Sequence, residues 1–298
     1  MQIHYVLCLY GFLCVGLFSQ AQDTTNLLQV LENETAKNKT EFATAVFRTT
    51  RIVDGQSTET LPKRVLDLRI SHRFGPLSSG LYNFFGLDNA TMRLGFDYGF
   101  TDYLMAGIGH STYQKTYDAF VKLRLLRQST GAVKRPVTVS LVTVFAVNTL
   151  RQLDTVKTTF SDRFSAVYQI LISRKFSEQF ALQLMPTLVQ EDNISFSHPD
   201  KWQLAIGIGA RQRISKRLSI NAEYFYQLPG MQSPGSHNVF SLGVDIATGG
   251  GHVFQLHFTN SFGITEKSFI TETTGRWDKS DILFGFNISR VFQFRKKH

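Results

Sequence analysis

The chain has 298 residues, of which 43% are hydrophobic and 26 are phenylalanine, and its formal net charge is +9 at pH 7. This length permits one large domain or two small ones. Both cysteines, Cys8 and Cys14, lie near the N-terminus in a segment that we expect to be removed. The mature chain then has no disulfide, no cysteine nucleophile and no cysteine-ligated metal.

The first element is an apolar run from Val6 to Phe18, which has the length of a signal-peptide core. It is shorter than the roughly 17 to 25 residues that a membrane-spanning helix needs. Small residues in Ser19-Gln20-Ala21 predict cleavage before Gln22. The preceding residues carry no lysine or arginine, so an uncleaved start is the alternative. We expect a signal peptide over residues 1–21, and therefore export.

The excess of basic residues favours anionic partners. Nucleic acid is the usual interpretation of such a charge, but an exported chain meets lipopolysaccharide phosphates and anionic solutes instead. We therefore expect contacts with outer-membrane lipid and lipopolysaccharide, with a small solute or with a periplasmic protein, and none with nucleic acid.

Residues 22–61 differ in pattern from the rest of the chain. A polar stretch from Asn33 to Lys39 is followed by a stretch that predicts a strand over Phe42 to Ile52. We interpret this part as a periplasmic N-terminal extension that folds back against or into a pore.

From residue 63 to the C-terminus, segments of about ten to fourteen residues alternate between apolar and polar side chains. In Ala90 to Phe100, for example, Leu94 and Phe96 fall on one face of a strand, and Arg93 and Asp97 fall on the other. Each segment is long enough to cross a bilayer as a tilted strand of about 9 to 11 residues. The predicted segments are Lys63 to Phe74, Ala90 to Phe100, Tyr103 to Tyr113, Tyr117 to Arg127, Pro136 to Asn148, Asp162 to Lys175, Gln179 to Gln190, Lys201 to Arg213, Arg217 to Gln227, His237 to Ala247, His252 to Phe262 and Asp281 to Phe294.

The connections alternate between tight turns and longer loops, as in outer-membrane barrels, whose short turns are periplasmic and whose loops face outside. Turn chemistry is present at Thr101-Asp102, Ser177-Glu178, Ser215-Lys216 and Gly249-Gly250-Gly251. Two connections depart from the rule, because 114–116 is short for a loop and 128–135 is long for a turn. The sequence predicts an all-β fold: a single transmembrane antiparallel up-and-down β-barrel of about twelve strands over residues 62–298.

Charged side chains share one face of these strands with polar neighbours, and the opposite face is apolar. A soluble sandwich would place apolar residues on that first face as well, because its core lies between two sheets. In a wide barrel a ladder of lumen charges sets ion selectivity, whereas in a narrow barrel the same charges form a salt-bridged plug. The candidate ladder consists of Asp67, Arg69, Arg73, Arg93, Asp97, Asp118, Lys122 and Arg124, and Arg211, Glu223 and Asp245 share its parity.

A resemblance to a known family is carried by six stretches: Thr49 to Val53, Glu59 to Pro62, Leu66 to Gly75, Asn83 to Asp88, Arg93 to Gly99 and Gln114 to Asp118. They resemble a family of uncharacterised Gram-negative outer-membrane β-barrel proteins, classed as a domain of unknown function. The resemblance runs from about residue 49 to 128 and more loosely to the end. It implies the barrel fold and the outer-membrane location, and it assigns no catalytic residues.

Ser71-His72 is the most suggestive catalytic pair, since a histidine beside a serine can serve nucleophilic catalysis. Adjacent strand residues point to opposite faces, however, so we expect Ser71 to face inward and His72 outward. His257 is predicted to face the lumen, where it is either a ligand of a metal or haem iron or an ordinary hydrogen-bonded histidine. No second ligand lies at a neighbouring i, i+2 position, so we expect no metal, no cofactor and no enzymatic activity.

Two glycine motifs, Gly107-Ile108-Gly109 and Gly207-Ile208-Gly209, superficially resemble nucleotide-binding loops. Neither opens a helix, which a phosphate-binding loop requires. Within strands they indicate barrel curvature or room for a neighbouring side chain.

Three functional hypotheses follow. The leading one is a channel or carrier for a small solute across the outer membrane. The second is a closed structural or docking barrel whose N-terminal extension binds a periplasmic partner. The third is a lipid-modifying enzyme that pairs Ser71 with a distant histidine.

Overall fold

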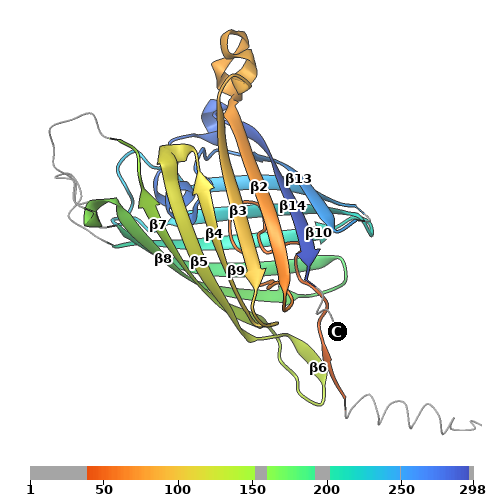
Figure 1. Cartoon of the computed structure of the whole chain (residues 1–298). Helices are drawn as coiled ribbons and strands as arrows, with labels where there is room; N and C mark the ends of the chain where they lie inside the picture. Colours follow the sequence, from red (N-terminus) through yellow and green to blue (C-terminus); the bar gives the residue numbers. More distant parts are fainter. Residues whose placement is uncertain (1–38, 152–159, 192–201, 249, 295–298) are drawn as a thin grey trace, which may run out of the picture.

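Twelve antiparallel strands close into one barrel in the computed structural model, which describes residues 39–151, 160–191, 202–248 and 250–294 (Figure 1). Each barrel strand pairs with the next barrel strand along the chain, and β14 pairs with β2 to close the ring. The prediction of a single all-β barrel of about twelve strands is confirmed. The barrel strands are β2 (Val65–Pro76), β3 (Ala90–Gly99), β4 (Leu104–Ser111), β5 (Thr116–Leu126), β7 (Thr138–Asn148), β8 (Phe164–Lys175), β9 (Phe180–Glu191), β10 (Trp202–Arg213), β11 (Leu218–Gln227), β12 (Val239–Ala247), β13 (His252–Thr259) and β14 (Leu283–Gln293).

The faces of the barrel follow the alternation of the sequence. In β3, Arg93 and Asp97 are each 1% exposed and point into the barrel, whereas Leu94 and Phe96 are 38% and 42% exposed on its outer wall. A polar interior with an apolar outer wall reverses the arrangement of a soluble protein and is the arrangement of a transmembrane barrel. The sandwich alternative is therefore ruled out.

The two ends of the barrel differ. The end that we call the turn end carries the β3–β4, β8–β9, β10–β11 and β12–β13 connections, together with the start of β2 and the end of β14. The opposite end, the loop end, carries the β2–β3, β4–β5, β7–β8, β9–β10, β11–β12 and β13–β14 connections. In Figure 1 the β2–β3 connection lies at the top and β6 at the bottom.

The two connections with unexpected lengths have structural reasons. Between β4 and β5 the chain turns through a short 3-10 helix, η3 (Tyr113–Lys115), in which Gln114 and Lys115 take left-handed φ angles of 52° and 51°. Between β5 and β7 it forms an additional strand, β6 (Ser129–Gly131), which pairs with β1 (Thr40–Phe42) in a separate two-stranded sheet. This turn is long because it supplies the partner of the N-terminal strand.

Residues 43–61, which we call the inner segment, lie inside the barrel. Their side chains are largely buried; Phe47 is 1% and Gln56 0% exposed. The strand predicted over Phe42 to Ile52 is wrong, because β1 ends at Phe42 and the chain then bends. Two backbone hydrogen bonds, from Ile52 N–H to Gly55 O (2.8 Å) and from Ser57 N–H to Thr50 O (2.9 Å), fold the segment into a narrow hairpin. Residues 1–38, which include the predicted signal peptide and the start of the extension, lie outside the described residues.

A short helix, α2 (Glu266–Thr271), in the β13–β14 connection occupies the interior from the loop end, and its Phe269 is fully buried. Within the described ranges, no helix has the length and apolarity needed to cross a membrane. The remaining 3-10 helices are η1 (Leu77–Ser79), η2 (Leu81–Gly86), η4 (Ser161–Arg163) and η5 (Trp277–Lys279).

The inner segment leaves the barrel where β3 has a glycine, and this glycine is needed for the close approach. A Cβ atom on Gly99 would lie 2.7 Å from the Leu61 carbonyl oxygen and closer still to that of Pro62. We expect Gly99→Ala to shift the backbone there and to lower the free energy of unfolding by about 1–3 kcal/mol, as overpacking does. Urea unfolding in lipid vesicles measures this.

Gly250→Ala is the matched control for Gly99→Ala. A Cβ atom on Gly250 would meet only the His252 side chain, at 3.3 Å. Equal unfolding midpoints for the Gly99→Ala variant and the unmodified protein would contradict the steric role assigned to Gly99.

Candidate functional site

The lumen contains most of the charged side chains that the sequence predicts there. Seven of the eight candidate ladder residues are at most 5% exposed: Asp67, Arg69, Arg73, Arg93, Asp97, Asp118 and Lys122. Arg124 is half-buried and donates a hydrogen bond to the Asp102 backbone oxygen at the turn end. Arg124 keeps the predicted parity, since it pairs in register with the buried Ser140, but it is the last residue of this row before the register shifts, so its side chain reaches out of the lumen to the turn.

The clearest pair in this set is Arg93 with Asp118. The guanidinium Nε lies 2.9 Å from Oδ1, and Nη2 lies 2.5 Å from Oδ2, so the contact is bidentate and spans β4. Gly109 of β4 leaves the room for it, because a Cβ atom there would overlap the Arg93 guanidinium. In the second motif, a Cβ atom on Gly207 would lie 2.5 Å from Phe225. The prediction that these glycines make room for neighbouring side chains is confirmed.

Lys122 holds the two limbs of the inner segment together. Its ammonium group donates hydrogen bonds to three backbone oxygens, those of Thr50 (2.9 Å), Ser57 (2.8 Å) and Glu59 (3.1 Å). Thr50 lies on the first limb of the hairpin, and Ser57 and Glu59 lie on the second. One wall cation therefore binds three carbonyl groups of the hairpin, and the Thr50 oxygen among them also accepts the Ser57 N–H.

Glu223 holds the tip of the hairpin in the complementary way. Its carboxylate accepts the backbone N–H groups of Val53 (3.2 Å), Asp54 (2.6 Å) and Gly55 (3.2 Å). The Asp54 side chain in turn forms a buried ion pair with Arg73 of the wall. The tip is thus bound by charges of both signs.

Neutral side chains complete the contact along β8 and β9. The Gln183 side-chain amide donates to the Gln56 backbone oxygen at 2.7 Å and accepts the Thr58 backbone N–H at 2.9 Å. The hydroxyl groups of Thr58 and Ser173 lie 2.6 Å apart. The inner segment is therefore held mainly through its backbone, by polar side chains of the wall.

The inner segment also contacts α2, which enters from the loop end. Arg51 forms an ion pair with Glu266 at 2.6 Å, and the Gln56 amide donates to the same carboxylate at 2.9 Å. Phe269 of α2 packs on Phe225 with ring centroids 5.1 Å apart. The N-terminal hairpin and the loop helix thus meet inside the lumen and fill it together.

Other candidate residues form no catalytic or metal-binding arrangement. Ser71 is 3% exposed and faces inward, while His72 stacks outward on Phe286 at 4.9 Å, as strand parity predicts. His257 faces inward as predicted, but the expected hydrogen bond is wrong, because neither of its ring nitrogens has a partner in the described part of the chain. The same residues contain no group of three or more histidine, cysteine, aspartate or glutamate side chains that could hold a metal ion.

Sequence reasoning missed the residues by which the inner segment binds. Asp54-Gly55 is a strong hairpin signal within the stretch interpreted as an extension. Glu223 was recognised as inward by parity, but nothing in the sequence selected its partners. Glu223 could be matched with its partners only once the structure showed that the backbone of Asp54 and Gly55 lies inside the lumen.

A family model described as a membrane bound beta barrel domain (DUF5777) matches residues 47–292. No sequence among the curated proteins matches. The match to the family model therefore begins within the inner segment and ends in β14.

Solved structures with a similar fold include the NanC porin (8% identity, TM-score 0.48, covering 77% of this chain and 100% of that chain). A KdgM porin in complex with disordered oligogalacturonate is similar at 6% identity and a TM-score of 0.46, covering 78% and 99%. Outer membrane phospholipase A from Escherichia coli is similar at 10% identity and a TM-score of 0.39, covering 77% of this chain and 92% of that chain. All three TM-scores are below 0.5, so these similarities carry no argument about activity.

The contacts of Lys122 predict its effect on the inner segment. Lys122→Met removes the side-chain donor of the Ser57 and Glu59 carbonyl groups and one of the two donors of the Thr50 carbonyl group, at a cost of about 1–3 kcal/mol. We expect amide hydrogen exchange within residues 43–61 to accelerate about tenfold or more, while the barrel strands stay protected. Lys134→Met, which changes an exposed lysine in the β5–β7 connection, is the control. Unchanged exchange in the Lys122 variant would contradict the role assigned to this ammonium group.

Proposed function

Because the chain belongs to the membrane bound beta barrel domain family, whose description states a fold and a membrane location but no activity, we propose a function from its lumen. The protein is an outer-membrane conduit for a small solute that is closed at rest by its own inner segment. The observation that carries this proposal is the Lys122 contact, which binds both limbs of a hairpin that is not part of the barrel wall.

The inner segment has the properties of a removable plug. Both of its limbs reach the turn end, since one continues from β1 beside β6 and the other leads into β2. It can therefore withdraw without threading through a loop. Its backbone is held by side-chain hydrogen bonds, which water replaces at a net cost of about 0.5–1.5 kcal/mol each for neutral groups and about 1.5–3 kcal/mol each for the charged groups Lys122 and Glu223. Withdrawal would also remove Arg51 from Glu266 and so release α2.

The proposed orientation follows from the two ends and the outer wall. Short turns and chain termini are periplasmic in bacterial barrels, and longer loops are external. Exposed aromatic side chains at the turn end, such as Tyr103 (56%) and Phe176 (56%), fit the girdle that meets lipid headgroups. With the turn end in the periplasm, the plug enters from the periplasmic side. Outer-membrane lipid and lipopolysaccharide are the surrounding partners in this proposal.

A second candidate function, a docking barrel, is favoured by β1. Among the described residues this strand pairs with β6 alone, in a sheet outside the barrel wall, and none of them pairs with its other edge, which suits the addition of a further strand. Phe42 within it is 49% exposed. A periplasmic protein that adds a strand there would bind the protein directly in front of the plug. We propose that neither function involves catalysis.

Conductance across a planar bilayer tests the conduit. The mature chain has no cysteine if residues 1–21 are removed, so Thr58→Cys with Ser173→Cys places one cross-link between plug and wall, where the hydroxyl groups are 2.6 Å apart. We expect ion openings from the reduced protein, none from the oxidised protein, and larger openings when residues 22–61 are deleted.

The matched control cross-links two wall strands instead. Gln169→Cys with Thr187→Cys joins register partners on β8 and β9 and leaves the plug free, so oxidation should leave the openings unchanged. Silence of the deletion variant, or equal openings from the oxidised and reduced Thr58 and Ser173 pair, would refute a plugged conduit. A strand-adding partner that binds the silent protein would then favour the docking barrel.

A further inference from the structure

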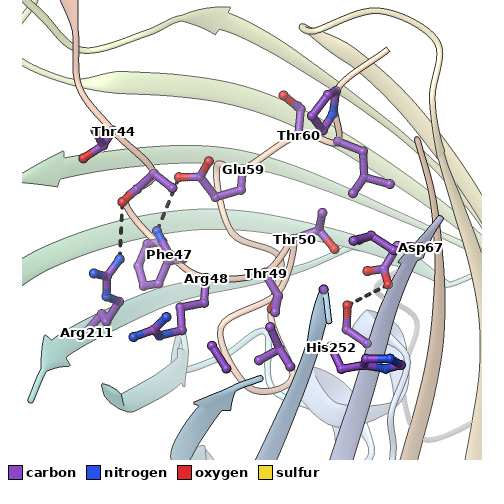
Figure 2. A pocket seen from close by; sticks show the side chains of 18 of the residues that line it. Thr44, Phe47, Arg48, Thr49, Thr50, Glu59, Thr60, Asp67, Arg211 and His252 are labelled. Atoms are coloured by element: carbon purple, nitrogen blue, oxygen red, sulfur yellow. Dashed lines mark hydrogen bonds between the residues drawn. The ribbon is translucent and has the colours of Figure 1, made fainter. Parts of the chain in front are cut away.

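A cavity of about 670 Å³ opens at the turn end between the inner segment and the barrel wall (Figure 2). The inner segment contributes Arg48, and β10 contributes Arg211 and Arg213. Lys216 of the β10–β11 turn adds a further cation. In Figure 2, Arg48 and Arg211 lie on the same side of the cavity, next to Phe47. The volume is in the range of pockets that hold small organic molecules.

Arg48 and Arg211 form no direct ion pair among the described residues, and Asp245, which accepts the Ser219 hydroxyl that Arg48 also contacts, offsets only part of their charge. Arg48 donates to the Ser219 hydroxyl (3.0 Å) and the Lys216 backbone oxygen (2.9 Å), and Arg211 donates to backbone oxygens of the inner segment. Neither has a carboxylate within 4.0 Å among the described residues. Arg211 is only 7% exposed, and its Nε has no hydrogen-bond partner in that part of the chain. A buried charged donor without a partner is costly, and an anion would satisfy it.

The three carboxylates that line the cavity are engaged elsewhere. Glu178 pairs with Lys175 at 2.6 Å and with Arg213 at 3.6 Å, and the hydrogen bond from Lys175 lowers the pKa of Glu178. Glu59 accepts the Val46 N–H at 2.6 Å. Asp67 accepts the Ser289 hydroxyl, also at 2.6 Å. Arg48, Arg211 and Lys216 outnumber the carboxylates that act on this side of the cavity, Asp245 and Glu59, so its net charge is positive.

The rest of the cavity lining includes a group of apolar side chains: Phe47, Leu61, Pro62, Val253 and Val291. We infer that this cavity binds a small organic anion, a carboxylate or phosphate ester on an apolar body, with its charged group between Arg48 and Arg211. Because one arginine belongs to the plug and the other to the wall, the bound anion bridges them and stabilises the closed barrel.

Calorimetric titration in an uncharged detergent tests this inference, with phenyl phosphate as the probe. The oxidised Thr58→Cys and Ser173→Cys protein is used throughout, so the plug stays in place and binding is measured whether or not the barrel conducts. We expect saturable binding that weakens at least tenfold in Arg211→Gln with Arg213→Gln, since the charge-assisted donor Arg211 and the neighbouring positive charge of Arg213 are lost. Arg217→Gln, in the same turn as Lys216 but outside the cavity lining, should bind as the parent does.

Two further ligands distinguish the contribution of the anionic group to binding from that of the apolar ring. Benzyl alcohol has a similar ring without the charge and should not bind, and inorganic phosphate should bind more weakly than phenyl phosphate. No saturable binding of phenyl phosphate, or equal binding by the Arg211 and Arg213 variant, would overturn the anion site. Equal affinity for inorganic phosphate would overturn the organic body. Circular dichroism confirms that each variant is folded.

Discussion

The backbone of the inner segment has no strand partner inside the barrel, and this constraint organises the lumen. Buried N–H and C=O groups must be hydrogen-bonded, because an unsatisfied group costs free energy that a domain can seldom spare. The wall supplies these partners through charged side chains of both signs. Lys122 donates to carbonyl oxygens of both limbs, and Glu223 accepts the N–H groups of the tip. Removing either would leave several backbone groups unpaired at once.

The same constraint explains why the lumen is polar although a chain segment occupies it. An apolar lumen would offer no hydrogen-bond partners to the N–H and C=O groups of the inner segment, and burying these groups there would cost free energy. Arg93, which forms no hydrogen bond to the inner segment, is paired within the wall with Asp118. The lumen charges therefore act as binding groups for a chain segment in the closed state. Their role in ion selection stays a prediction, since it concerns the barrel after the plug has moved.

The plug lies between two possible sources of control. At its tip side, Arg51 contacts Glu266 of α2, which belongs to a loop-end connection. At its base, Arg48 lies beside the proposed anion cavity at the turn end. A change at either place alters contacts of the same hairpin, so a solute on one side and an anion on the other would act on a single element. A partner strand bound to β1 would act on the same hairpin from the turn end, since β1 leads directly into it.

The alternation of side chains was sufficient to predict the barrel, because a strand has a period of two and each face meets one environment. Arg93, Asp97, Leu94 and Phe96 could be assigned to their faces from parity alone, and so could Ser71 and His72. Arg124 marks the limit of that rule, because parity assigns it to the inner face but does not show that the row ends there and that its side chain reaches the turn.

The sequence by itself determined the class of fold, the number of barrel strands, the polar lumen and the kind of family to which the chain belongs. Only the tertiary structure decided that residues 43–61 fill this lumen and are not a strand over Phe42 to Ile52. The physical reason is that their backbone partners are side chains such as Lys122 and Glu223, which lie about 60 to 170 residues further along the chain. No local pattern encodes such a contact, because only closure of the barrel brings its two sides together.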